Sequence, residues 1–227
     1  MFLLDVPVSA AHDLVSSLAG ALDALGEPST AAAIVLFTAA VRLLLLPLAV
    51  AQARAERTRT RLLPQLQALQ KKHAKDPQQL RKATADLYAA EGASPLAGCL
   101  PGLAQWPFFA VMYQLFVSAT VAGHQNLLLT HTLLGAPLGQ NLLSVGLFSS
   151  GALVFAGLLV LLALVAWWSS RRVTVTGPMG NVARLLPFGT VAVAAFVPLA
   201  AGLYLLASTT WAASERAILH RRIVAIP

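Results

Sequence analysis

The chain has little charge and almost no cysteine. Only 11% of its 227 residues are charged, against about a quarter in a soluble globular domain, and 57% are hydrophobic. So few charges cannot cover a soluble surface, and the composition indicates a membrane protein. The one cysteine, Cys99, excludes a disulfide framework and a cysteine-based zinc site. The sequence shows no catalytic nucleophile, acid–base pair, metal cluster or phosphate loop, so we expect no enzyme activity, no metal and no cofactor.

Long apolar runs take the place of the missing charge. Three of them, residues 31–51, 97–122 and 146–168, are each long enough to cross a hydrocarbon core of about 30 Å. We predict that each is a transmembrane helix.

A fourth run, residues 182–213, is too long for one crossing, at about 1.5 Å of helix per residue. Arginines lie on both sides of it, and the positive-inside rule therefore requires an even number of crossings. We predict two short spans, 184–197 and 199–215, which fold back near Pro198 because proline interrupts a helix. The expected fold class is an all-α integral membrane protein with five transmembrane helices.

The basic residues set the expected orientation. The formal net charge is +7, and every Lys and Arg except Arg42 lies in or beside three segments, 52–96, 169–183 and 216–227. The positive-inside rule places all three in the cytoplasm. We therefore expect a multi-pass protein of the cell membrane with its N-terminus outside, loop 123–145 outside and its C-terminus in the cytoplasm.

Residues 1–30 contain four acidic residues and no Lys or Arg. The missing basic segment argues against a signal peptide. An apolar stripe recurs at helical spacing, formed by Ala11, Leu14, Val15, Leu18, Leu22 and Leu25. We predict an amphipathic helix on the outer membrane face, which ends at Gly26-Glu27-Pro28.

The polar segment 52–96 has the pattern of a helical hairpin. Leucine stripes mark two helices, and Asp76-Pro77 between them is an N-cap followed by proline at the first helical position. The segment is strongly basic, through Arg54, Arg57, Arg59, Arg61, Lys71, Lys72, Lys75, Arg81 and Lys82. The simplest interpretation of these charges is a solvated face that also signals topology. The functional interpretation adds docking to anionic lipid or ribosomal RNA, and both can be true.

Arg42 is the most informative residue, because it lies inside an apolar run. At helical rise it is about 14 Å from the cytoplasmic end of span 31–51, where an arginine costs a few kcal/mol and normally faces a bundle interior or a wet cavity. One interpretation is a buried polar partner, although Glu215 is the only acidic residue in any predicted span. The other is a cation that attracts an acidic peptide. Thr38 and Gln105 are polar residues of the kind that would line such a cavity.

Three motifs occur in an order and spacing that resemble those of a known family. They are LFTAAVRL at residues 36–43, GASPLAGCLPGLAQWP at 92–107 and PLAAGLY at 198–204. With the basic hairpin between the first two, the chain resembles the YidC/Oxa1/Alb3 family of membrane protein insertases, in the short bacterial form without a large periplasmic domain. It departs from the family in the last span, where Leu205, Thr209 and Glu215 replace a tryptophan, an asparagine and a glutamine.

The resemblance implies a function. It implies insertion of nascent membrane proteins from the cytoplasm, alone or with the Sec translocon, through a hydrophilic groove lined by Arg42, Thr38, Gln105, Trp106 and Phe109. Expected partners are nascent membrane proteins, anionic lipids, the ribosome, the signal recognition pathway and the Sec translocon. The alternative is a small secondary transporter or channel, but we find no internal repeat and only one ionisable group deep in a span. A purely structural assembly factor remains a further alternative.

Overall fold

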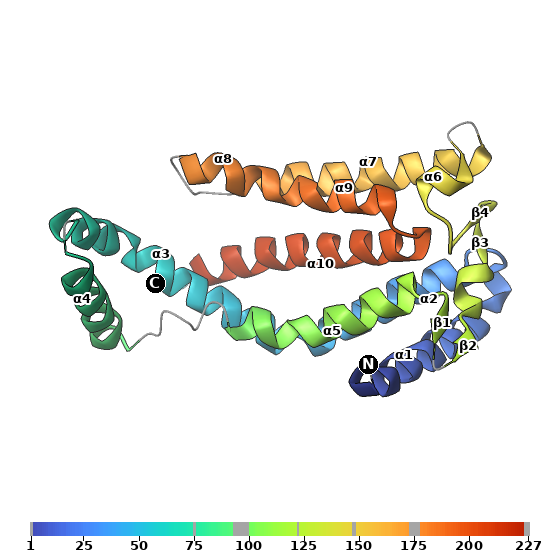
Figure 1. The fold of residues 1–227 in the computed structure, drawn as a ribbon, viewed down its shortest axis with the longest axis horizontal. Coiled ribbons are helices and arrows are strands. Elements are labelled where there is room, and N and C mark those ends of the chain that lie inside the picture. The colour runs from blue at the N-terminus through green and yellow to red at the C-terminus, as the bar shows by residue number, and fades with distance from the viewer. Residues whose placement is uncertain are drawn as a thin grey trace. The chain divides into compact units, whose positions relative to one another are not determined.

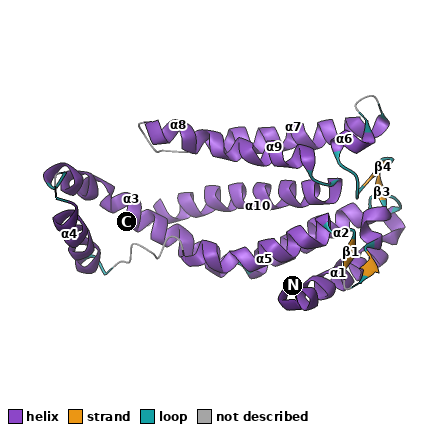
Figure 2. Cartoon of the chain, in the orientation of Figure 1, coloured by secondary structure: helices purple, strands orange, loops and turns teal. Residues whose placement is uncertain are grey.

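The computed structural model describes residues 2–74, 76–92, 100–121, 123–146, 149–172 and 178–224, and these are mostly helical (Figure 2). The chain divides into two compact units. The larger unit comprises Met1–Leu43 and Phe108–Glu215, and the smaller one comprises Leu44–Pro107 and Arg216–Pro227. Predicted residues Lys75, Cys99 and the neighbours of Cys99 from 93 to 98 lie outside the described residues.

Ten α-helices are described, and Figure 1 labels them. In chain order they are α1 (Phe2–Ala21), α2 (Ser29–Leu44), α3 (Leu46–Lys72), α4 (Pro77–Ala90), α5 (Leu100–Val117), α6 (Leu142–Val145), α7 (Ser150–Ser170), α8 (Pro178–Leu185), α9 (Gly189–Phe196) and α10 (Leu199–Val224). Short 3-10 turns lie at Asp23–Leu25, Leu127–Thr130 and Leu186–Phe188.

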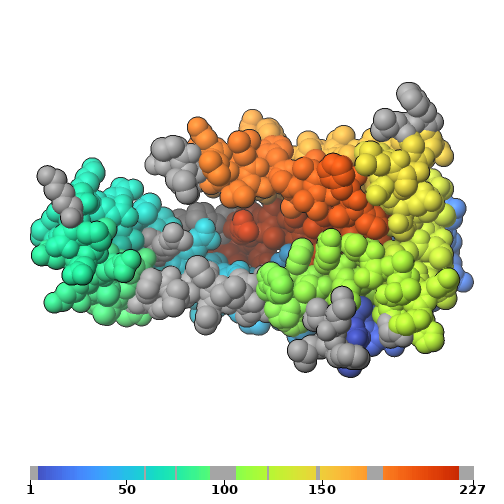
Figure 3. Space-filling model, viewed as in Figure 1, coloured from blue at the N-terminus to red at the C-terminus, as the bar shows by residue number. Residues whose placement is uncertain are grey.

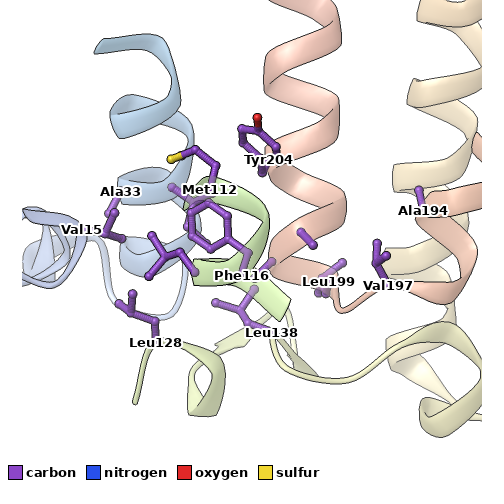
Figure 4. Close-up of a cluster of buried hydrophobic side chains, with 14 of the residues drawn as sticks. Val15, Ala33, Met112, Phe116, Leu128, Leu138, Ala194, Val197, Leu199 and Tyr204 are labelled. Atoms are coloured by element: carbon purple, nitrogen blue, oxygen red, sulfur yellow. The ribbon is translucent and has the colours of Figure 1, made fainter. Parts of the chain in front are cut away.

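The core of the larger unit gathers side chains from almost all of its elements (Figure 4). Phe116 of α5 and Leu199 of α10 are both fully buried, at 0% exposed. Val15 of α1 joins them, so the N-terminal helix packs on protein along part of its apolar stripe. Leu14 and Leu25, which belong to the predicted stripe, are 59% and 54% exposed. Part of the predicted apolar stripe is therefore buried in the protein core, and the rest is exposed on the surface.

Helix α10 is fixed at its first turn by the chain that precedes α6. The first amide groups of a helix have no partner inside the helix. Here Leu199 N–H donates to the Gln140 carbonyl and Ala200 N–H donates to the Leu138 carbonyl, each at 2.9 Å. Further along, Gly202 packs so closely on α7 that a Cβ atom there would lie 2.5 Å from Leu158 Cδ2. These contacts place α10 against α7 inside the unit.

Four short strands correct the all-α prediction. Strand β1 (Thr120–Val121) pairs with β2 (His124–Gln125), and β3 (Thr132–Leu133) pairs with β4 (Ala136–Pro137), both antiparallel. Leu134 and Gly135 join β3 to β4 with φ of 51° and 79°, the two positive values that a tight hairpin turn requires. Strands of two residues are too short to show an alternating pattern, which explains why the sequence predicted only a loop at 123–145.

Helix boundaries differ from the predicted segments in three places. Predicted span 31–51 is interrupted at Leu45, ahead of Pro47, and the second part continues into the first arm of the hairpin. Predicted span 184–197 is divided by a 3-10 turn at Leu186–Phe188, around Pro187. The predicted tail 216–227 continues α10 as helix to Val224. In the first two places proline lacks the amide that a regular helix needs.

Among the described residues, one helix is long and apolar enough by itself to cross a membrane, and this is α7. A second candidate exists if α2 and the first part of α3 count as one broken span. Shorter apolar helices cover Trp106–Val117 and Asn181–Phe196. Five transmembrane helices therefore remain a prediction.

The smaller unit contains the hairpin of α3 and α4. The side chain of Asp76 accepts hydrogen bonds from the N–H groups of Gln78 and Gln79, so the predicted N-cap is confirmed. Leu62 on α3 and Tyr88 on α4 are buried, at 1% and 8% exposed. An exposed ion pair between Arg61 and Glu91 links the two arms, and pairs of this kind contribute at most about 1 kcal/mol.

The cap at Asp76 leads to a first prediction. Asp76→Ala should destabilise α4 by about 1 kcal/mol, because two amide donors lose their acceptor. Hydrogen exchange should then quicken in residues 77–82 while the rest of the chain is unchanged. Asp86→Ala is the matched control, since Asp86 is an exposed carboxylate in the middle of the same helix. Equal effects of the two substitutions would show that the cap contributes nothing.

A second prediction concerns the close approach at Gly139. Its N–H donates to the Leu129 carbonyl at 2.9 Å, and a Cβ atom would lie 2.9 Å from that same oxygen. Gly139→Ala should therefore lower the free energy of unfolding by about 1–3 kcal/mol, as overpacking does. Gly157→Ala in α7 has open space around it and should be neutral or stabilising. Thermal unfolding in detergent measures both, and an unchanged midpoint for Gly139→Ala would contradict the expected clash.

Candidate functional site

Arg42 lies in the last turn of α2 and is half-buried within the larger unit. Its Nη2 atom donates a hydrogen bond to Ser208 Oγ on α10. Ser208 is itself 6% exposed, so the arginine reaches a buried hydroxyl rather than solvent. Of the two interpretations of Arg42, a buried polar partner is therefore found, and Ser208 is one such partner.

Ser208 belongs to a polar stripe along α10. Tyr204, Ser208, Trp211 and Glu215 follow one another at spacings of four, three and four residues, which places them on one face of the helix. The Tyr204 side chain lies next to Ser208. Trp211 Nε1 is buried and has no hydrogen-bond partner within the described part of the chain, and Glu215 Oε1 is buried as well. Polar groups thus follow this face of α10 for about 16 Å, at 1.5 Å per residue.

Aromatic rings from α5 lie beside Tyr204, at the N-terminal end of this polar stripe. Phe109 stacks on Tyr113 with ring centroids 6.0 Å apart, and it lies 6.3 Å from the ring of Tyr204. The ring centroids of Phe116 and Tyr204 are 5.9 Å apart, and Phe116 is fully buried. Figure 4 shows Tyr204 of α10 next to Phe116 and Met112 of α5. Phe109 and Tyr113 are each 44% exposed, so this aromatic wall is buried at one end and open at the other.

The predicted groove residues have different positions. Arg42 and Phe109 both contact the polar stripe of α10, through Ser208 and Tyr204 respectively. Thr38 is 2% exposed, and its hydroxyl donates to the Ile34 carbonyl at 2.7 Å, so that donor is used inside α2. Trp106 is in the smaller unit and is 68% exposed. The side chain of Gln105 lies outside the described part of the structure.

Sequence reasoning missed Ser208 as a partner of Arg42. Ser208, Thr209 and Thr210 are three consecutive hydroxyl residues, and a hydroxyl in a helix usually bonds to its own backbone. Thr209 does so, donating to the Leu205 carbonyl at 2.7 Å, whereas Ser208 accepts from Arg42. The signal that distinguishes them is the spacing of polar residues along one face of α10, rather than their proximity in sequence.

Two other helices of the larger unit, α7 and α9, expose large apolar side chains. On α7, Leu153 is 76% and Val160 58% exposed, and on α9 Phe196 is 67% exposed. A soluble monomer seldom shows so many large apolar side chains, whereas a lipid-facing helix normally does. The described residues contain no group of three or more His, Cys, Asp or Glu that would hold a metal ion.

The surface of the larger unit is hollowed over α10. In the space-filling view, α10 lies deep between the side chains of α9 and those of α5 (Figure 3). The ribbon view shows the same order of layers, with α7 and α9 on one side of α10 and α5 with α2 on the other (Figure 1). Arg42, Ser208 and Tyr204 come from the helices that meet at this place.

Comparisons with known proteins point to one family. Residues 22–225 match the family model described as 60Kd inner membrane protein. The chain is 44% identical over 85 residues to the membrane protein insertase YidC of Oceanobacillus iheyensis. This aligned region covers 36% of this chain and 34% of that protein. It is 30% identical over 193 residues to the membrane protein insertase YidC of Acidiphilium cryptum. This second aligned region covers 82% of this chain and 31% of that protein. The chain thus spans about a third of the length of these curated relatives.

A solved structure gives the same result for the fold. The crystal structure of an active YidC insertase with its first transmembrane domain resolved matches 96% of this chain and 46% of that one, with a TM-score of 0.56 and 24% sequence identity. At this identity the likeness concerns the fold. The family model, which covers most of the chain, establishes the relationship. The chain therefore belongs to the family of the 60Kd inner membrane protein, the YidC/Oxa1 family.

Proposed function

We propose that this protein is a membrane protein insertase, which passes polar segments of nascent membrane proteins over the polar stripe of α10 and releases their apolar helices into lipid. The observation that carries the proposal is the hydrogen bond from Arg42 to Ser208, which holds a positive charge beside the aromatic wall of α5. The names of the relatives, membrane protein insertase YidC, support the same activity.

The first step of the proposed mechanism is electrostatic. A half-buried guanidinium attracts a carboxylate more strongly than a solvated one does, with an interaction of about 4 kcal/mol at 4 Å for an effective dielectric constant of 20. Ser208 accepts a hydrogen bond from one terminal nitrogen of this guanidinium, which fixes its position beside α10. Acidic residues in the translocated segment would therefore bind next to Arg42. Phe109 and Tyr113, both partly exposed, would offer apolar and stacking contacts to the segment.

The second step is the release of the apolar helix. The exposed side chains of α7 and α9 form a surface as apolar as lipid tails. An apolar client helix therefore gains no hydrophobic free energy by staying on this surface instead of moving into the lipid. Transfer out of water favours burial by about 25 cal/mol per Å² of apolar surface. The polar stripe shortens the distance over which the translocated segment meets a purely apolar environment.

We further propose the membrane arrangement predicted from the charges. Spans 31–51, 97–122, 146–168, 184–197 and 199–215 cross the cell membrane, with the N-terminus outside and the C-terminus in the cytoplasm. The described basic side chains of the hairpin support a cytoplasmic docking role, because Arg54, Arg57, Lys71, Lys72 and Lys82 are all exposed. Anionic lipid, the ribosome, the signal recognition pathway and the Sec translocon are the proposed partners.

Cysteine labelling tests this arrangement. In a Cys99→Ser background, single cysteines at Gln70 and Asn181 should react with an impermeant maleimide only from the cytoplasm. Cysteines at Ser17 and Gln125 should react only from outside. All four native side chains are exposed, so accessibility does not limit the reaction. Labelling of Asn181→Cys from outside would overturn the five-span arrangement.

The role of Arg42 is tested with paired client proteins that differ only in acidic residues of the translocated segment. Arg42→Ala should lower insertion of the acidic client into proteoliposomes by about tenfold, or roughly 1.4 kcal/mol, and spare the neutral client. Arg42→Lys should keep most of the activity, because the point charge survives.

Two further substitutions separate charge from structure. Ser208→Ala keeps the positive charge and should lower thermal stability while the preference for the acidic client persists. Glu215→Gln removes a carboxylate from the same face of α10 and should strengthen that preference. If Arg42→Ala impairs both clients equally, together with folded yield, Arg42 is a structural hydrogen-bond donor and the attraction step is wrong.

A further inference from the structure

Two arginines at the end of α7 are stacked on tryptophan rings. The guanidinium carbon of Arg171 lies 4.0 Å from the centroid of the Trp167 ring, and that of Arg172 lies 4.4 Å from the centroid of Trp168. Each arginine covers the residue four positions before it, because side chains on a helix lean towards its N-terminus. The arrangement is thus repeated at two adjacent positions directly after α7, which holds two guanidinium groups at the same end of the helix.

A guanidinium held over a ring keeps N–H donors available for an anion, because it carries five donors and the ring contact needs none of them as hydrogen-bond donors. Both arginines are exposed. A planar fork held in this way matches two oxygens of a phosphate or carboxylate, and less side-chain freedom is lost on binding.

The chain offers these arginines no nearby acidic partner in sequence. From Gly92 to Ser214 the sequence contains no Asp or Glu. The carbonyl groups at the end of α7 carry only a partial negative charge, which favours the arginines at this position without neutralising two full charges. An anion from outside the chain is therefore the natural complement of this pair.

The position of the pair indicates which anion. Helix α7 has 21 residues, or about 31 Å of helix, which equals the hydrocarbon thickness of a bilayer. Its exposed side chains are apolar, and the tryptophans followed by arginines stand at its end. When α7 spans the bilayer, indole rings lie at the interface and guanidinium groups lie at the depth of the lipid phosphates.

We propose that Trp167, Trp168, Arg171 and Arg172 form a binding site for the phosphate of an anionic phosphoglycerolipid. Each guanidinium donates to headgroup oxygens, and each indole both fixes a guanidinium and packs on the upper part of an acyl chain. The site lies outside the polar stripe of α10 and does not depend on insertase activity.

Native mass spectrometry of the full chain in detergent tests the site. Dioleoylphosphatidylglycerol is titrated against dioleoylphosphatidylcholine, and the preference for the anionic lipid is measured. Arg171→Gln together with Arg172→Gln should lower this preference by roughly tenfold or more, because both positive charges near the lipid surface are removed. Trp167→Leu with Trp168→Leu keeps the helix apolar and both charges, and should lower the preference by a smaller factor.

Controls make the outcome decisive. Arg184→Gln removes an exposed arginine of the same unit that has no ring contact in the described structure, and should leave the preference nearly unchanged. Arg171→Lys with Arg172→Lys should keep some attraction and lose most of the preference, because the fork is gone. Thermal unfolding of each variant checks that it is folded.

Several results would overturn the proposal. One is an Arg184→Gln effect as large as that of the double substitution, which would indicate general charge attraction. A second is full retention of the preference when both arginines are replaced. The third is displacement of the lipid by millimolar inorganic phosphate, or by a short RNA as readily as by more phosphatidylglycerol, which would identify a site for phosphate in general.

Discussion

The arrangement of the larger unit depends on how one positive charge is accommodated among apolar helices. Arg42 carries a charge that is costly to bury, and its hydrogen bond to Ser208 gives the guanidinium a polar partner inside the unit. This bond requires α10 to present its polar face to α2. The aromatic wall of α5 contacts the same face through Tyr204, so three helices are oriented around one stripe.

The position of α10 follows from two further constraints. The backbone carbonyls of Leu138 and Gln140 bind its first amide groups, which makes the segment before α6 a cap for a helix almost sixty residues away. Gly202 permits the close approach to Leu158 on α7. In the proposed function, a stripe that is already fixed at one end would not have to be ordered each time a peptide binds.

Some features of the fold could be read from local sequence alone. Asp76-Pro77 marks the start of α4, and Gly26-Glu27-Pro28 lies between the N-terminal helix and α2, as predicted. Capping and helix breaking depend on residues within one turn, so the pattern suffices. The strands at 120–137 and the 3-10 turn at Leu186–Phe188 were not predicted. The strand pairs are only two residues long and lack a period, and the turn interrupts an otherwise apolar run.

The sequence by itself determined that the chain is rich in apolar helix, that its charges are asymmetric and that Arg42 is the unusual residue of its first apolar run, since composition and periodicity are properties of the chain. Only the tertiary structure decided what Arg42 touches. Ser208 is 166 positions away in sequence, and several hydroxyls in the last helix were equivalent by composition. The packing of α10 on α2, α5 and α7 selected one of them, because it fixed the rotation of the helix. The same packing turned Thr38 into a buried side chain that bonds to its own helix, although sequence reasoning had placed it beside Arg42 in the groove.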